Sequence, residues 1–259
     1  MKESFATADP FEQFGRDGYL SHVRVHSQTD LAAARAEFDA TCTRYDRLAL
    51  QKNYLLHDRH IWVDEIWSLV TAPALLDLLE CLIGGHIVLL GSRFLCKWPR
   101  DSTWVPWHQD SAKAGLSPNR QVVVWYAVDE ARIDNGCLRV IPSSHLHGSL
   151  PHSPSGRREE WLVPRELADF SRAPTDGVGL ELELGECAVF DSHLIHGSMP
   201  NSSNDRRCGL ILRYAPASSK PLCPGQWAAL VVRGSDANGN FHNLTREDAK
   251  DFTYRPAPE

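Results

Sequence analysis

The chain has 259 residues, of which 42% are hydrophobic and 23% charged, and its formal net charge is −6. This length suits one large domain and is too short for two independent domains of ordinary size. No stretch gathers Lys and Arg into a basic stripe, so the composition gives no electrostatic basis for nucleic-acid binding.

The N-terminal ten residues are polar and mixed in charge, without the apolar centre of a secretory signal. The longest apolar runs, such as 122–128, are too short to span a bilayer. Seven cysteines are scattered without a C-x-x-C spacing, which argues against a disulfide framework or a structural zinc site. We therefore expect a reduced, cytoplasmic protein with no membrane partner.

Helical patterns are predicted in the first third of the chain. Residues 9–17 form a short capped helix that leads to Gly18, and 29–45 a longer one with an apolar face. A third helical region covers 61–82, where Pro73 restarts a helix that stops at a Gly-Gly pair.

Short apolar segments separated by turn residues follow, and they predict strands. The segments are 87–91, 94–98, 121–127, 137–141, 181–184, 188–190 and 208–214. Together they predict an α+β, mainly β chain whose core is a closed or sandwiched antiparallel fold. We expect a single domain, 1–259, with a helical preface over about 1–86, a β core over about 87–216 and a C-terminal extension over about 217–259.

The stretch 151–175 contains four prolines and many charges, so we interpret it as a surface insertion and a candidate lid. The tail from Pro221 is rich in Gly and Pro and is expected to be irregular.

A metal site is indicated by His108 and Asp110, which are two residues apart and face the same side of an extended chain. A third ligand has to come from a distant strand, and the segment 192–198 supplies His193 and His196. Two histidines and one carboxylate form the facial triad of non-haem Fe(II) oxygenases, with three positions open for a bidentate 2-oxo acid and dioxygen.

Arg207 follows His196 by eleven residues and begins a predicted strand. An arginine in this position can bind the distal carboxylate of 2-oxoglutarate with two parallel hydrogen bonds. Its neighbour Arg206 is expected to face solvent.

Several motifs then appear in one order: Lys97-Trp-Pro, Trp107-His-Gln-Asp110, a segment 134–145 that reads DNGCLRVIPSSH, Gly185-Glu-Cys-Ala-Val-Phe, a segment 196–201 that reads HGSMPN, and Arg207. This stretch of nearly half the chain resembles the phytanoyl-CoA dioxygenase family. Ser143 stands where the family usually has Gly, a difference that matters only if the position needs a positive φ.

The resemblance implies a double-stranded β-helix, the cupin-like jelly roll, with N-terminal helices packed on it. It implies Fe(II), 2-oxoglutarate and O2 as cofactor and co-substrates, and His196 rather than His193 as the third ligand. Further co-substrate contacts are implied at the following positions: Ser198, Trp125, Arg93 and Lys97. The expected activity is hydroxylation of an unactivated C–H bond, with release of succinate and CO2.

The substrate is expected to be a small molecule, with an amino-acid derivative and a natural-product intermediate as the candidates. His57 lies in a region that borders the substrate pocket in the family, and Trp107 adds an aromatic surface near the site. Arg213 is on the last predicted core strand and could meet an anionic group. No sequence feature fixes the oligomeric state.

Two other functions use the same residues. A metal-dependent hydrolase could carry a bound hydroxide on the His/Asp/His site, but Arg207 and Ser198 would have no task in it. A non-catalytic jelly-roll binding protein would not need an intact triad. The chain has no G-x-S-x-G elbow, P-loop or G-x-G-x-x-G motif.

Overall fold

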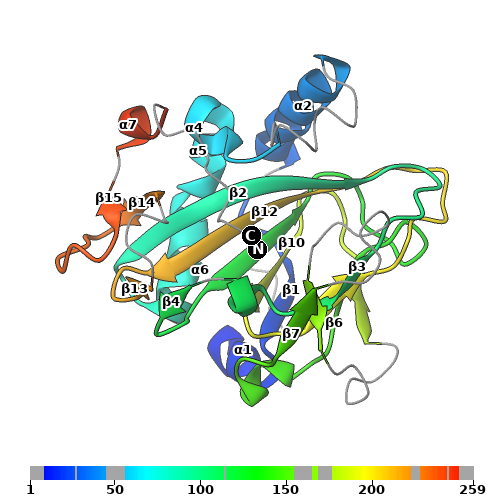
Figure 1. The fold of residues 1–259 in the computed structure, drawn as a ribbon. Coiled ribbons are helices and arrows are strands. Elements are labelled where there is room, and N and C mark those ends of the chain that lie inside the picture. Colours follow the sequence, from blue (N-terminus) through cyan, green and yellow to red (C-terminus); the bar gives the residue numbers. More distant parts are fainter. Residues whose placement is uncertain are drawn as a thin grey trace.

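The computed structural model describes residues 9–26, 28–44, 56–113, 115–154, 165–168, 177–222, 228–243 and 245–250. Within them the chain forms two facing β-sheets with helices on the outer side of the larger one (Figure 1). The larger sheet has the order β1-β10-β5-β12-β2-β14-β15 and the smaller one the order β3-β11-β6-β9. The predicted α+β, mainly β class is confirmed.

The helices are α1 (Pro10–Asp17), α2 (Gln28–Arg44), α4 (Arg59–Trp62), α5 (Asp64–Val70), α6 (Pro73–Ile83) and α7 (Arg246–Lys250). The strands of the larger sheet are β1 (Tyr19–Val23), β2 (Ile87–Lys97), β5 (Val122–Ala127), β10 (Cys187–Asp191), β12 (Arg207–Pro216), β14 (Ala228–Arg233) and β15 (His242–Asn243). The smaller sheet contains β3 (Val105–His108), β6 (Leu138–Val140), β9 (Val178–Leu180) and β11 (His196–Ser198). Two short pairs remain: β4 (Leu116–Ser117) with β13 (Lys220–Pro221), and β7 (His152–Pro154) with β8 (Arg165–Leu167).

The chain passes repeatedly between the two sheets, for example from β5 to β6, from β9 to β10 and from β10 through β11 to β12. This alternation gives the double-stranded β-helix, or jelly roll, that the resemblance implies. Side chains on β5 alternate accordingly. Val123 and Trp125 pack between the sheets, whereas Val124 and Tyr126 pack against the helical layer. Both faces of this strand are therefore buried, which explains its unbroken apolar run.

Residues that favour helix termini mark the ends of α1 and the start of α6. Asp9 caps α1 by accepting a hydrogen bond from the Phe11 amide at 3.0 Å, and Gly18 ends the helix in the left-handed conformation. Pro73 opens α6, as predicted. The predicted region 61–82 is divided among α5, α6 and the second half of α4, because Val63 is extended and Thr71 and Ala72 interrupt the helix.

The first two predicted strands, 87–91 and 94–98, are one continuous strand, β2, so the break predicted between them was wrong. The intervening residues Ser92 and Arg93 pair with Leu212 and Ile211 of β12 without interruption. A strand that is fully paired with its neighbour can contain polar residues. In the sequence alone, such residues suggest a turn.

The strand predicted at 181–184 is displaced. Residues 178–180 form β9, and 181–184 contribute only an isolated bridge between Leu182 and Ala131. Leu184 already belongs to the turn that precedes β10.

Three strands of the larger sheet lie outside the region 87–216. β1 pairs with β10, β14 pairs with β2, and β15 pairs with β14. The expectation of an irregular tail from Pro221 was therefore wrong for β14, β15 and α7. The candidate lid at 151–175 lies mostly outside the described residues, which include only 151–154 and 165–168, with β7 and β8.

Residues 64–83 are long and apolar enough to span a membrane, by length and composition alone. They form two helices, however, and Leu75 and Leu79 are fully buried in the core between the helical layer and the larger sheet. We interpret them as core helices of the jelly roll.

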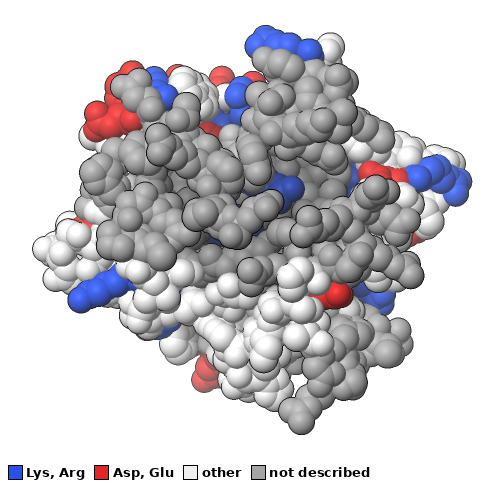
Figure 2. Space-filling view, viewed as in Figure 1, with Lys and Arg blue, Asp and Glu red and all other residues white. Residues whose placement is uncertain are grey.

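Charged side chains are mixed on the surface. Among the described residues on the face drawn in Figure 2, basic and acidic groups lie interspersed around the rim.

We expect Leu79→Ala to lower the free energy of unfolding by about 2–5 kcal/mol, because it leaves a cavity beneath the sheet. Urea denaturation followed by circular dichroism measures this loss. Leu222→Ala is the matched control, since Leu222 is 64% exposed, and it should change stability by less than about 0.5 kcal/mol. Equal effects of the two substitutions would contradict this description of the core.

Candidate metal centre

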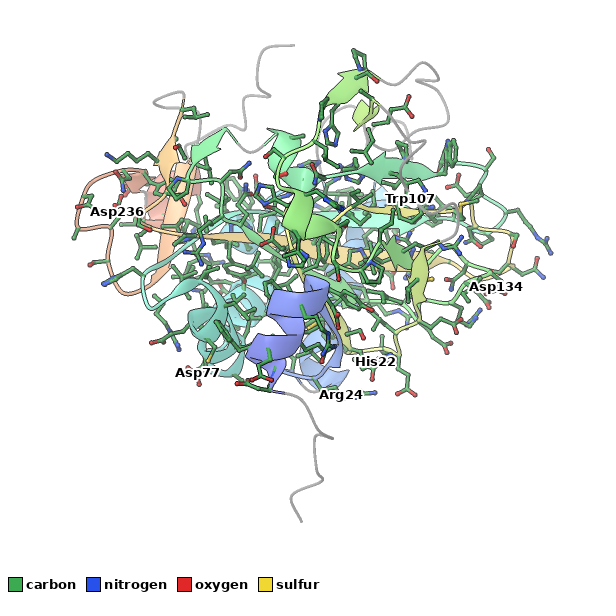
Figure 3. All side chains as sticks on the ribbon, turned by 90° about the horizontal axis from the view of Figure 1, so that it is seen from below. His22, Arg24, Asp77, Trp107, Asp134 and Asp236 are labelled. Carbon is green, nitrogen blue, oxygen red and sulfur yellow. The ribbon has the colours of Figure 1, made fainter. Side chains whose placement is uncertain are left out.

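Three predicted ligands meet at one end of the smaller sheet. His108 ends β3, His196 begins β11, and the two residues are direct partners in the antiparallel ladder. Asp110 follows on the first turn after β3. Ligand atoms of the three side chains all lie within 4.8 Å of one another. Trp107, which is labelled in Figure 3, marks the strand that delivers His108.

The imidazoles are oriented by backbone carbonyls. Nδ1 of His108 lies 2.9 Å from the Pro106 carbonyl oxygen, and Nδ1 of His196 lies 2.9 Å from that of Leu194. With the proton on Nδ1, each ring donates to its carbonyl and presents the Nε2 lone pair to the centre. His108 Nε2 is 3.7 Å from Asp110 Oδ1, and His196 Nε2 is 3.9 Å from Asp110 Oδ2.

The protonation states suit metal binding. Burial lowers the pKa of His196 to about 3, and the neighbouring His108 adds to this effect, so the ring stays neutral. Burial by itself would raise the pKa of Asp110, but Arg213 and the two histidines outweigh it and hold that pKa well below its usual range. Two neutral imidazoles and one carboxylate are the donor set that fits Fe(II) with open coordination positions.

His193 lies outside this cluster. Its ring Nδ1 is 3.0 Å from Asp191 Oδ1, and its backbone amide donates to the same oxygen at 2.7 Å. The geometry therefore separates the two histidines of the segment 192–198, which spacing alone could not do.

A second set of buried polar atoms lies around Arg207, which is only 1% exposed. Its Nε donates to the Gly136 carbonyl at 2.8 Å, Nη2 donates to the same oxygen, and its guanidinium stacks on the Trp125 ring at 5.3 Å. Within the described residues, Arg207 Nη1 and Ser198 Oγ have no hydrogen-bond partner. Buried donors without acceptors are costly, and a carboxylate would satisfy both.

Two glycines make room for this arrangement. A Cβ on Gly209 would lie 2.2 Å from Trp125 Cζ2, so the indole ring can lie flat against β12 only because that residue has no side chain. Gly136 has φ +82°, and a Cβ there would lie 2.5 Å from the Met199 carbonyl oxygen. Neither role was predicted; the glycine within the Cys208–Tyr214 run was the only sequence signal for the first.

Lys97 lies opposite Arg207 in the β2–β12 ladder and is fully buried. Its Nζ donates to the Ser198 carbonyl at 3.0 Å and to that of Met199. Burial lowers the pKa of Lys97 to about 6, with a further contribution from Arg207. Lys97 thus fixes the backbone that carries Ser198, and its direct contact with a co-substrate stays a prediction.

The predicted substrate residues are divided between two places. Arg213 reaches the metal site, where its Nη2 is 3.3 Å from Asp110 Oδ1, and His57 forms an isolated bridge with Arg93. Trp107 instead packs in a cluster with Ile141, Leu167 and Ile195. Its substrate role stays a prediction that this placement does not favour.

Arg206 was expected to face solvent, but it is held by contacts within the protein. Its side chain forms ion pairs with Asp129 and Asp39 and lies over the Phe38 ring. The two consecutive arginines therefore have separate tasks, one joining α2 to the sheet and the other pointing between the sheets.

The sequence of this chain is similar to those of known proteins. A family model described as phytanoyl-CoA dioxygenase matches residues 14–209. L-proline trans-4-hydroxylase of Streptomyces griseoviridis is 29% identical and covers 91% of this chain and 96% of its own. The probable alpha-ketoglutarate-dependent hypophosphite dioxygenase of Stutzerimonas stutzeri is 31% identical over 68% of this chain and 63% of its own.

Solved structures show the same fold. The non-heme monooxygenase ThoJ in its apo form has a TM-score of 0.76 at 26% identity, covering 92% of this chain and 88% of its own. CytC3 with Fe(II) and alpha-ketoglutarate has a TM-score of 0.67 at 21% identity and covers 91% of each chain. At that identity the second likeness concerns the fold.

We expect His196→Ala to weaken anaerobic Fe(II) binding by at least about 100-fold, because a ligand is lost. Calorimetric titration of the metal-free protein measures the dissociation constant. His193→Ala removes the same side chain three residues away and should bind Fe(II) like the unaltered protein. Equal losses in both variants would contradict the ligand assignment.

The buried lysine predicts a pH dependence of stability. Between about pH 6 and pH 10.5 the unfolded chain holds the Lys97 proton and the folded chain does not, so folding releases a proton and stability rises with pH. Lys97→Met lacks this contribution. Urea unfolding of the two metal-free proteins gives the free energy of unfolding of each. The value for the unaltered protein minus the value for the variant should increase by about 2 kcal/mol from pH 7 to pH 9. A difference that is flat or falls would show that Lys97 stays charged.

Proposed function

The chain belongs to the phytanoyl-CoA dioxygenase family and is an Fe(II)- and 2-oxoglutarate-dependent dioxygenase, and we propose that its own reaction is hydroxylation of an unactivated C–H bond of a small molecule. The reaction consumes the substrate, 2-oxoglutarate and O2 and yields the alcohol, succinate and CO2. The observation that carries this proposal is the pair of unsatisfied buried donors, Arg207 Nη1 and Ser198 Oγ, beside the His/Asp/His cluster.

His108, Asp110 and His196 are proposed to hold the Fe(II). When bound, the metal and its co-substrate supply the oxidising power, because oxidative decarboxylation of 2-oxoglutarate is coupled to oxidation of the substrate. The protein's own contribution is to orient both imidazoles and to keep the carboxylate ionised. The carbonyls of Pro106 and Leu194 accept the Nδ1 protons and so direct both Nε2 atoms to the centre, while burial keeps the His196 ring neutral.

Arg207 and Ser198 are proposed to bind the distal carboxylate of 2-oxoglutarate. Two of the guanidinium donors are already used by Gly136, which leaves Nη1 as the fixed donor for the ligand. The Trp125 ring lies against the guanidinium, with its centroid 5.3 Å from Arg207 Cζ, and so covers one side of this position. A donor that is held in place before binding loses little conformational freedom when the co-substrate arrives.

Water is excluded by the apolar residues packed between the sheets around Trp125. They are Val123, Ala127, Ala131, Leu138, Val140, Leu180, Leu182, Ala188, Phe190 and Leu194. A dry environment strengthens the interaction of a carboxylate with a buried guanidinium.

The alternatives explain less. A metal-dependent hydrolase needs only the three ligands and a bound hydroxide, so the buried donors of Arg207 and Ser198 would be an unexplained cost. A binding protein without catalysis would gain nothing from two imidazoles oriented by carbonyls.

The proposed substrate class remains small molecules, with an amino-acid derivative and a biosynthetic intermediate as candidates. The relatives named above act on L-proline and hypophosphite, according to their descriptions, and both compounds are small. A cytoplasmic location stays an expectation.

We expect the anaerobic complex with Fe(II) and 2-oxoglutarate to show a weak visible charge-transfer band. Arg207→Ala should raise the 2-oxoglutarate concentration needed for half of this band by about 10- to 100-fold, because a charge-assisted contact is lost. Spectrophotometric titration measures this change.

Arg206→Ala is the matched control, since it removes the neighbouring guanidinium and breaks the ion pairs with Asp129 and Asp39. It should lower stability and leave the titration midpoint unchanged. Iron binding without any band in the unaltered protein would reject the dioxygenase reaction and favour the hydrolase.

A further inference from the structure

The three proposed metal ligands are oriented in different ways. The rings of His108 and His196 are held by backbone carbonyls, each through an Nδ1 contact of 2.9 Å. Asp110 lies beyond the end of β3, at the start of a short 3-10 turn. Within the described part of the chain, the hydrogen bond that reaches its carboxylate comes from Arg213, whose Nη2 donates to Oδ1 at 3.3 Å. A side chain from the opposite sheet therefore orients the third ligand.

The two oxygens of the Asp110 carboxylate have different surroundings. Oδ1 accepts the hydrogen bond from Arg213 and lies 3.7 Å from His108 Nε2. Oδ2 lies 3.9 Å from His196 Nε2 and accepts no hydrogen bond from the described residues. With the ring protons on Nδ1, neither Nε2 atom donates to the carboxylate. Oδ2 is thus the oxygen whose lone pairs remain available to a metal ion.

The number of oxygens that Asp110 gives to the metal decides how many positions stay open. Three protein donors leave three positions, and a bidentate 2-oxo acid and dioxygen together need all three. A carboxylate can bind a metal through one oxygen or through both. Binding through both would occupy one of the three open positions. The reaction therefore requires that Asp110 bind through a single oxygen.

A guanidinium on Oδ1 favours binding through a single oxygen. It occupies a lone pair of that oxygen, and its positive charge is unfavourable for a cation at the same atom. The Asp110 side chain is only 9% exposed and that of Arg213 is 32% exposed. The contact is therefore shielded from solvent at the carboxylate, unlike an ion pair on the open surface.

The sheet directs Arg213 toward this position. Arg213 pairs with Gly91 of β2, but the next residue, Tyr214, pairs with Leu89, so Leu90 is an extra residue in the ladder. Such a β-bulge bends the strand and changes the direction of the side chains beside it, and bulges are frequent next to active sites. Because Gly91 has no side chain, the position opposite the arginine is not filled from β2.

A second carboxylate, that of Asp58, lies near Arg213 but is bonded elsewhere. Its Oδ1 accepts a hydrogen bond from the Ser92 amide at 2.9 Å. Burial raises the pKa of Asp58 to about 6, and the Ser92 hydrogen bond and the charge of Arg213 oppose this rise. Among the described residues, the ion pair of Arg213 is formed with Asp110.

We propose that Arg213 is a positioning residue that keeps Asp110 a one-oxygen ligand of the metal, bound through Oδ2; this inference rests on the proposed function. In this role the guanidinium acts through Asp110 and does not touch the metal. Arg207 and Arg213 then have complementary tasks on one strand. Arg207 binds the co-substrate, and Arg213 preserves the coordination positions that the co-substrate and dioxygen need.

A crystal structure of the unaltered protein with Mn(II) and 2-oxoglutarate tests the geometry directly. Mn(II) takes the same ligands as Fe(II) and is stable in air. We expect Asp110 to bind the metal through Oδ2 alone, with Oδ1 still hydrogen-bonded to Arg213. Coordination through both oxygens, or an Arg213 side chain turned away from Asp110, would overturn the inference.

Variants test the consequence in solution, with nitric oxide as a probe of the dioxygen position. In the anaerobic complex with Fe(II) and 2-oxoglutarate, Arg213→Met should raise the nitric oxide concentration needed for half of the paramagnetic resonance signal by about 10-fold. Arg213→Lys keeps a charged donor and should restore most of the affinity. Arg233→Met is the matched control, because it removes a guanidinium that is bonded to Asp77 and Glu80 on the surface, and it should change nothing.

A merely structural role for Arg213 would lower the thermal unfolding midpoint and leave the nitric oxide titration unchanged, which would overturn the inference. If Arg213→Met does not fold, the Mn(II) complex of the unaltered protein decides. In either case an intact charge-transfer band with 2-oxoglutarate would leave the proposed function standing. Absence of that band in the unaltered protein would instead reject the proposed function.

Discussion

The pairing of β2 with β12 is the constraint on which the site depends. This ladder places Lys97 opposite Arg207 and Gly91 opposite Arg213, so it fixes the positions of the nitrogen-bearing side chains of Lys97, Arg207 and Arg213 along one inner face. A shift of the register by one residue would turn these side chains toward the apolar helical layer, where no acceptor could satisfy them. Burial of the alternate residues on the outer face, Leu210 and Leu212 among them, therefore also determines where the charged groups lie.

Buried donors need acceptors, and the backbone provides them here. Arg207 donates to the Gly136 carbonyl, and Lys97 donates to carbonyls of the strand that carries the third metal ligand. Asn201 completes the connection by donating to the Trp98 and Asp205 carbonyls, at 2.8 Å and 2.7 Å. These hydrogen bonds connect the segments around 97–98, 136, 198–201 and 205–207, while Arg207 Nη1 and Ser198 Oγ are among the buried polar atoms of the described residues that have no partner.

The sequence predicted the features that local spacing encodes. His108 and Asp110 are close because they are two residues apart, and the helices around Gly18 and Pro73 follow from their termini. It could not predict that β2 is continuous, or that Gly209 gives Trp125 its place, because both depend on what the neighbouring strand presents. The choice between His193 and His196 came from the resemblance, and its physical reason is the ladder that pairs His196 with His108.

The two inward arginines of β12 differ in what surrounds them, and this difference separates their tasks. Arg207 is 1% exposed and held by a carbonyl and an indole ring, so it suits a ligand that is the same in every turnover. Arg213 is 32% exposed, and its Nη2 lies 3.3 Å from Asp110 Oδ1, so this guanidinium is partly open to solvent beside a proposed metal ligand. Six residues of one strand thus set the distance between the two guanidiniums, with the proposed metal ligands beside the second arginine. A rigid strand keeps that distance constant, which is what selective oxidation of one C–H bond requires.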